Sequence, residues 1–173
     1  MRGTPTITAA LAATLAAILA PSAASADPAI ETTPVIAAAD AFFEALRSSD
    51  KTALRETMLD EAVIFVHDRR DRAKPKLRIV PAGDHLDGWV KTPQGTDEYM
   101  HYQHVRVDGY MAHIWGPYVF LLNGKPTHCG INSMSFARTE EGWRVANTSF
   151  TMTALDECEP LGAPMPAEAK AAK

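Results

Sequence analysis

The chain has 173 residues, with 17 Lys and Arg against 21 Asp and Glu, which gives a formal net charge of −4 and a pI near 5.8. This acidic balance argues against nucleic-acid binding through bulk charge, and a hydrophobic content of 46% argues against a disordered chain. The length fits one or two domains.

Residues 1–26 have the order of a secretory signal peptide. Arg2 is followed by an apolar stretch over residues 7–20, then Pro21 and the small residues Ala24-Ser25-Ala26. As a helix the apolar stretch would span about 21 Å, short of the roughly 30 Å hydrocarbon core of a bilayer. An uncleaved membrane anchor is the alternative. We therefore predict an exported protein, periplasmic or secreted, with no membrane segment after cleavage.

After a short lead-in at residues 27–32, Thr33-Pro34 is typical of a helix start, with Thr33 as the N-cap. Helical spacing of apolar residues follows at Val35, Ala38, Ala39, Phe42, Phe43 and Leu46. A second helix is expected over residues 51–59, capped by Asp50. The β-branched run 62–66 then predicts a strand.

Residues 68–78 hold six basic and two acidic side chains. This stretch is either a solvated loop or the rim of a binding site for an anionic ligand or an anionic surface. A short helix is expected around residues 84–91, with Leu86, Trp89 and Val90 facing inward.

The region from about Tyr99 to Met152 predicts a four-strand antiparallel meander. Turns are expected at Asp108-Gly109, Asn123-Gly124 and Glu141-Gly142, because Asn-Gly and Asp-Gly pairs adopt the angles of two-residue hairpin turns. The Pro- and Ala-rich residues 159–173 are expected to form a disordered tail.

Cys129 and Cys158 are the two cysteines of the chain. In an oxidising compartment a disulfide between them is the default expectation. The alternatives are two free thiols, a metal site, or a nucleophilic Cys129 beside His128.

Several sequence stretches carry a resemblance to a known fold family. They are Ala39-x-x-x-Phe43, residues 60–65, residues 111–120, His128-Cys129-Gly130, and residues 136–145 with Gly142-Trp143-Arg144-Val145. Together with the order of helices and strands, they resemble the nuclear-transport-factor-2-like superfamily, which includes SnoaL-like and ketosteroid-isomerase-like proteins. The resemblance covers about residues 33–158 and is strongest for exported bacterial members.

The resemblance implies an α+β fold, in which N-terminal helices pack in the concave face of a strongly curved, mainly antiparallel sheet. This arrangement forms a cone with a pocket and often dimerises through the sheet, so a homodimer is expected. Members of the superfamily include isomerases, dehydratases, hydrolases and ligand-binding domains, so the fold does not settle the function.

The hairpin turns also predict a register. They place His104 opposite His113, His113 opposite Met134, and Trp115 opposite Asn132. One face would then collect Tyr102, His104, His113, Trp115, Asn132, Met134, Phe136, Asn147 and Ser149. This face mixes aromatic and polar groups as ligand pockets do. A bulge at Gly116-Pro117 would change the assignment beyond it.

His113, with His104 beside it, is the first candidate for a catalytic acid or base, and Asp68 is the second. The candidate ligand-binding residues are Tyr102, Trp115, Tyr118, Asn132, Met134, Phe43 and Trp89. For each of them a purely structural role in a half-buried sheet is the alternative. The six His residues do not form a set of three or four converging ligands, so we expect no metal, and no cofactor.

Three functions remain open. The first is an exported domain that binds a small molecule, which could be anionic. The second is a cofactor-free lyase, isomerase or hydrolase, and the third is a protein–protein interaction module. Neither nucleic acid nor a membrane is expected as a partner.

Overall fold

The structure is a computed structural model that describes residues 31–91 and 94–165. The helical segments are α1 (Thr33–Arg47), η1 (Lys51–Ala53), α2 (Leu54–Thr57), α3 (Ala82–Trp89), η2 (Leu155–Glu157) and α4 (Cys158–Leu161). The strands are β1 (Met58–Asp68), β2 (Lys76–Pro81), β3 (Thr96–Met100), β4 (His104–Asp108), β5 (Met111–Leu122), β6 (Lys125–Thr139) and β7 (Gly142–Met152). The signal peptide predicted at residues 1–26 lies outside the described residues.

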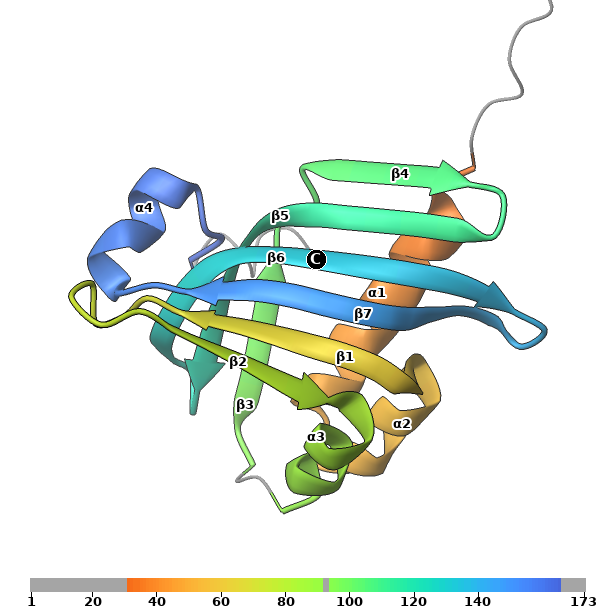
Figure 1. The fold of residues 1–173 in the computed structure, drawn as a ribbon, viewed down its shortest axis with the longest axis horizontal. Helices are drawn as coiled ribbons and strands as arrows, with labels where there is room; N and C mark the ends of the chain where they lie inside the picture. The colour runs from red at the N-terminus through yellow and green to blue at the C-terminus, as the bar shows by residue number, and fades with distance from the viewer. Residues whose placement is uncertain (1–30, 92–93, 166–173) are drawn as a thin grey trace, which may run out of the picture.

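Within the described residues, seven strands form one curved sheet with the order β2-β1-β7-β6-β5-β3, and β4 also pairs with β5. The β1–β7 pair is parallel and the other pairs are antiparallel. Figure 1 shows α1 lying across one face of this sheet, while β5 and β6 bend strongly at one end. The α+β class with a mainly antiparallel, curved sheet is confirmed.

The apolar face of α1 packs in the concave side of the sheet. Val35, Ala39, Phe43 and Leu46 are buried at the helical spacing expected from the sequence. They belong to one core cluster with sheet residues that include Ile64, Ile114, Met134, Phe136 and Val145. The predicted helix is therefore confirmed, although its N-cap is Thr32 and not Thr33.

Two glycines mark places where the backbone of another segment comes very close to the sheet. A Cβ on Gly116 would lie 1.8 Å from the carbonyl oxygen of His101, and a Cβ on Gly130 would lie 1.8 Å from that of Thr151. Only glycine fits at these positions. Gly116 lies where the edge of the sheet passes from β3 to β4, since both of these strands pair with β5.

Several predicted boundaries were wrong. The second helix ends at Thr57, and β1 already begins at Met58, because the chain enters the sheet four residues before the β-branched run. Residues 76–78, predicted as loop, begin β2, which pairs with β1 as a hairpin. In α3, Leu86 is buried as expected, but Val90, which follows the last residue of this helix, is 58% exposed.

The predicted register was also wrong, and this changes which residues share a face. Gly116 and Pro117 pair regularly with β6, while the register shifts by one residue nearer the turn, between Phe120 and Leu121. His113 therefore lies opposite Ser135, and Met134 lies opposite Ile114 in the core. The turn at 108–109 is displaced too, so that His104 lies opposite Trp115 and not opposite His113.

The disulfide expected between Cys129 and Cys158 is present, and both residues are buried. It ties α4 to β6 beside a small apolar cluster that includes Val119, Leu121 and Ala163. The folded chain thus continues past residue 158, where we placed the end of the domain. Residues 166–173 of the predicted tail lie outside the described residues. Among the residues that the structure describes, no helix is long and apolar enough to cross a membrane.

Candidate functional site

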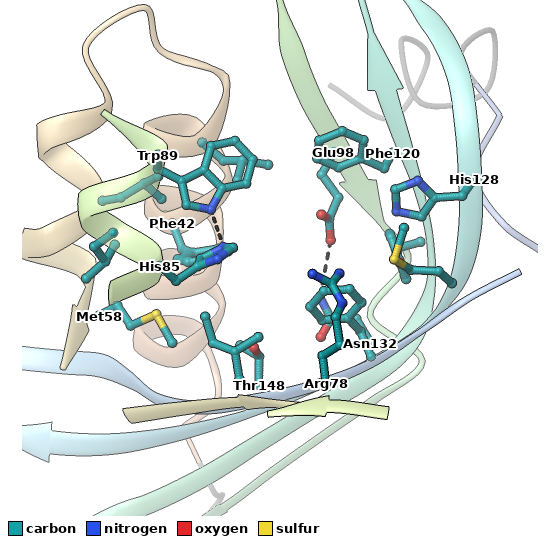
Figure 2. A pocket seen from close by; sticks show the side chains of 17 residues that line it. Phe42, Met58, Arg78, His85, Trp89, Glu98, Phe120, His128, Asn132 and Thr148 are labelled. Atoms are coloured by element: carbon teal, nitrogen blue, oxygen red, sulfur yellow. Dashed lines mark hydrogen bonds between the residues drawn. The ribbon is translucent and has the colours of Figure 1, made fainter. Parts of the chain in front are cut away.

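A cavity of about 200 Å³ opens between the helices and the concave face of the sheet. Figure 2 shows His85 and Trp89 on one side, and Glu98, Phe120 and His128 on the other. The cavity is lined by Phe42, Leu46, Leu54, Met58, Ile64, Arg78, His85, Leu86, Trp89, Glu98, Tyr118, Phe120, His128, Asn132, Thr148, Phe150 and Met152. Most of these side chains are apolar or aromatic, so the few polar groups determine what the cavity can recognise.

Glu98 is the central polar group of the cavity. It points inward because Thr96 and Glu98 alternate along β3 with the more exposed Asp97, and only 9% of its surface is exposed. The pKa of Glu98 is raised to about 8, mainly by burial. The hydrogen bond from Asn132 opposes this shift, the nearby Asp97 carboxylate adds to it, and the Arg47 charge opposes it. Glu98 is therefore mostly a neutral carboxylic acid at pH 7.

Asn132 on β6 is the partner of Glu98. Its Nδ2 donates to Glu98 Oε1 across 3.2 Å, and only 5% of Asn132 is exposed. The Oδ1 atom of Asn132 is buried and has no hydrogen-bond partner among the described residues. A buried acceptor without a donor is costly, so this atom is a position where a ligand donor would be stabilised.

His128 lies beside this pair, on the same wall of the cavity. Its ring stacks on Phe120 with centroids 5.1 Å apart, and Nδ1 lies 2.9 Å from the hydroxyl of Thr127. Burial lowers the pKa of His128 to about 4, and the Arg70 charge acts in the same direction. His128 is consequently neutral at pH 7 and contributes an aromatic wall rather than a charge.

The opposite wall is made by α3 and the segment that follows α1. The Trp89 indole donates to His85 Nε2, and burial lowers the pKa of His85, so that this ring is also neutral. Lys51 lies behind the wall, where its ammonium group donates to the Leu46 carbonyl and to the Thr96 hydroxyl and stands 5.8 Å from the Trp89 ring centroid. These contacts hold Trp89 against the cavity.

The structure brings three of the predicted ligand-binding residues to this cavity. They are Trp89, Tyr118 and Asn132. Tyr118 is fully buried, and its hydroxyl donates to the Thr151 carbonyl at 2.8 Å, so it shapes the wall without presenting a free donor.

Three other predicted ligand-binding residues lie elsewhere on the inner side. Phe43 and Tyr102 line a second, wider hollow of about 1050 Å³ between α1 and the β3–β4 edge. There the Tyr102 hydroxyl donates to Asp40 at 2.8 Å. Met134 is fully buried in the core.

His113, His104 and Trp115 lie on the outer face of the sheet, away from the cavity. His113 Nε2 is 2.9 Å from the Ser133 hydroxyl, and Trp115 is 40% exposed. The one-residue register shift between β5 and β6 explains this outcome, because it separates these residues from Asn132 and Met134.

Asp68, the other predicted catalytic residue, ends β1. Both of its carboxylate oxygens accept hydrogen bonds from Arg70, at 2.9 and 2.7 Å. The hydrogen bond from Arg70 lowers the pKa of Asp68 to about 2. A carboxylate held this way is a weak proton acceptor at neutral pH.

Sequence reasoning missed Glu98, His128 and His85. Glu98 was missed because the meander was expected to begin at Tyr99, one residue later. Thr96 and Tyr99, residue types that favour strands, could have indicated that the strand begins before Tyr99. Across residues 31–91 and 94–165, no three His, Cys, Asp or Glu side chains gather as a metal site would require.

Comparison with known proteins gives the fold. No family model matches the chain, and no curated protein matches it. Among solved structures, a nuclear-transport-factor-2-like protein of unknown function from Shewanella baltica has a TM-score of 0.53 at 14% identity, over 69% of this chain and 91% of that chain. A second such protein, from Shewanella oneidensis, has a TM-score of 0.55 at 13% identity, over 69% and 98%.

A third similar structure is described as a candidate dehydratase of the same family. It comes from Streptomyces avermitilis and has a TM-score of 0.53 at 19% identity, over 70% of this chain and 94% of that chain. Identities this low show a shared fold and leave the activity open.

Proposed function

We propose that this chain, which has the nuclear-transport-factor-2-like cone fold, binds a small and mainly apolar organic molecule in its cone cavity. The observation that carries the proposal is the buried Glu98–Asn132 pair in an otherwise largely apolar cavity. A folded protein rarely keeps a carboxyl group this deeply buried without a use for it.

The pair presents a complementary set of hydrogen-bonding atoms. Neutral Glu98 can donate from the carboxyl oxygen that Asn132 does not contact, and Asn132 Oδ1 can accept. A hydroxyl group satisfies both because it accepts and donates. The cavity, at about 200 Å³, is below the roughly 300–1,000 Å³ of pockets that take drug-sized ligands, so the ligand is small.

The test is an NMR titration of the isotopically labelled protein with 4-propylphenol and with propylbenzene, which lacks the hydroxyl. We expect saturable shifts at the amides of Glu98, Phe120 and Asn132, and tighter binding of the phenol. Glu98→Leu should weaken the phenol by about fivefold or more and leave propylbenzene unchanged. Glu61→Gln, a change at an exposed carboxylate of β1, is the control.

The proposal is abandoned if neither compound shifts the cavity amides up to its solubility limit. It is also abandoned if Glu98→Leu weakens the two compounds equally, because the carboxyl would then have no role in recognition.

Acid–base catalysis is the second candidate, and the pKa of Glu98 favours it. A carboxyl group that titrates near pH 8 can serve as general acid or as general base around neutrality. Catalytic roles for His113, His104 and Asp68 stay predictions. If a substrate is found, we expect turnover to fall by about a hundredfold or more in Glu98→Gln and to be unaffected by His113→Ala.

Export is part of the proposal. The buried Cys129–Cys158 disulfide supports an oxidising compartment, and the leader-like sequence at residues 1–26 supports secretion. Expression of the full sequence in an exporting bacterium should give a product that starts at Asp27, as measured by intact mass. A product that retains residues 1–26 and stays with the membrane fraction would contradict export.

A homodimer through the outer face of the sheet also remains a proposal. This face carries the exposed Trp115 and Met111 beside the small side chains of Ser133 and Ser135. Sedimentation should give a dimer that Trp115→Lys dissociates. A monomeric wild-type protein would argue against this arrangement.

A further inference from the structure

The basic side chains of residues 68–78 divide into neutralised and unpaired groups. Arg70 is held by Asp68, while Arg72 donates to Glu157 and Asp156 at 2.8 Å each. Arg69 forms a longer ion pair with Glu157, at 3.7 Å. These three arginines fasten the loop to its own carboxylate neighbours and to η2.

Arg78 is different. It lies on β2 opposite Val66, its side chain is exposed, and among residues 68–78 it is the one that lines the cavity. Figure 2 shows its side chain pointing from β2 into the cavity. Within the described residues it has no hydrogen bond or ion pair. The Asp68 carboxylate, which Arg70 binds through both oxygens, feels the Arg78 charge but makes no hydrogen bond or ion pair with it.

The rest of the cavity does not cancel the charge of Arg78. His85 and His128 are neutral at pH 7, since burial lowers the pKa of each. Glu98 is mostly protonated at that pH because burial raises its pKa to about 8. The described lining of the cavity therefore carries a net positive charge at its exposed side, next to apolar walls that focus the field.

We propose that the natural ligand is a small amphipathic organic anion, whose carboxylate binds Arg78 at the mouth and whose apolar body fills the cavity. This inference rests on the proposed function and adds the charge of the ligand. Arg78 is exposed and Glu98 is buried, so the two groups act at different depths and recognise different ends of one molecule. Guanidinium binds a carboxylate through two parallel hydrogen bonds, which fixes its orientation.

The experiment compares two probes that differ in one charge. 3-(4-Hydroxyphenyl)propionate carries a carboxylate and a phenol at opposite ends, and its primary amide keeps the shape without the charge. Dissociation constants are measured by NMR titration at pH 7 for wild type, Arg78→Ala, Arg78→Lys and Lys76→Ala. Lys76 is the matched control, because it is a cation two residues away on the same strand and does not line the cavity.

We expect the wild type to bind the acid at least about fivefold tighter than the amide, and this preference to weaken at high salt. Arg78→Ala should abolish the preference, Arg78→Lys should keep part of it, and Lys76→Ala should keep nearly all of it. If Arg78→Ala fails to fold, the test is whether the preference of the wild type for the acid over the amide weakens at high salt.

Equal binding of acid and amide by the wild type would overturn the inference, as would an Arg78→Ala variant that weakens both probes equally. In either case binding of 4-propylphenol at the cavity amides would leave the proposed function standing. If acid, amide and 4-propylphenol all fail to bind, the proposed function fails and this inference fails with it.

Discussion

Asn132 on β6 donates a hydrogen bond to the buried carboxyl group of Glu98 on β3, although β5 separates these two strands in the sheet. The bond joins two buried polar groups of the cavity and leaves Asn132 Oδ1 and one carboxyl oxygen of Glu98 available. In a site with apolar walls, these two atoms orient the buried end of a ligand.

The stability of the protein should fall as the pH rises from about 6.5 to 8, because of Glu98. The pKa of this carboxyl is about 8 in the folded state, against an ordinary value of 4.5 that applies to the unfolded state. Between these two pH values the folded state therefore holds more protons than the unfolded state. Stability from protonated Glu98 is fully present below pH 4.5 and is lost as the pH approaches 8. The whole change is on the order of a few kcal/mol.

Glu98→Gln should remove this pH dependence, and urea unfolding at a series of pH values measures it. The window above pH 6.5 is the informative one. Below it His128, whose folded pKa is about 4, acts in the opposite direction and destabilises the fold as the pH falls. Parallel stability curves for the wild type and Glu98→Gln between pH 6.5 and 8 would show that Glu98 is ionised in the folded protein.

Asn132→Leu should raise the pKa of Glu98 above its wild-type value. The hydrogen bond from Asn132 favours the carboxylate and is the largest effect that opposes burial, so its removal should raise the pKa. A carbon-13 NMR titration of the Glu98 carboxyl group measures the change directly. Asn147→Leu, on β7 opposite Ser135 and facing away from the cavity, is the control and should leave the titration unchanged.

Gly116→Ala should destabilise the fold by several kcal/mol or prevent folding. The new Cβ would lie 1.8 Å from the His101 carbonyl oxygen, and a backbone atom cannot move aside as a side chain can. Gly88→Ala in α3 meets nothing within 4 Å and should be neutral or gain up to about 1 kcal/mol from helix propensity. Thermal unfolding of both variants tests this, and equal melting temperatures would refute the close approach at Gly116.

Replacing both cysteines with alanine should lower stability by about 3 kcal/mol, since the disulfide closes a loop with a sequence separation of 29 residues. A reductant should lower the melting temperature of the wild type and leave the double variant unchanged. A reductant effect of equal size on both proteins would mean that the disulfide is not the target.

The elements of the fold were largely predictable, because their signals are local. The apolar spacing from Val35 to Leu46 predicted α1, and the glycine turns predicted the hairpins from β4 to β7. The cavity was less accessible to sequence reasoning. A one-residue register shift near Phe120 moves His113 to the outer face and leaves Asn132 inside, and nothing in the sequence locates that shift.

Glu98 was not predictable for a different reason, which is that its burial depends on contacts distant in sequence. Asn132 of β6 and Arg47 of α1, which contact Glu98, are far from it in sequence. The residues next to Glu98 in the sequence therefore do not indicate that its side chain is buried. The basic stretch shows the same effect, since the arginines held by Asp68, Asp156 and Glu157 cannot be told from Arg78 until the chain is folded.

The most direct test of the account is a crystal structure of the protein with 4-propylphenol. We predict that the phenol occupies the cavity, with its oxygen within hydrogen-bond distance of the Glu98 carboxyl group and of Asn132 Oδ1, and with its ring against Trp89 and Phe120. A phenol bound only elsewhere, such as on the outer face beside Trp115, with the cavity holding water, would contradict the account.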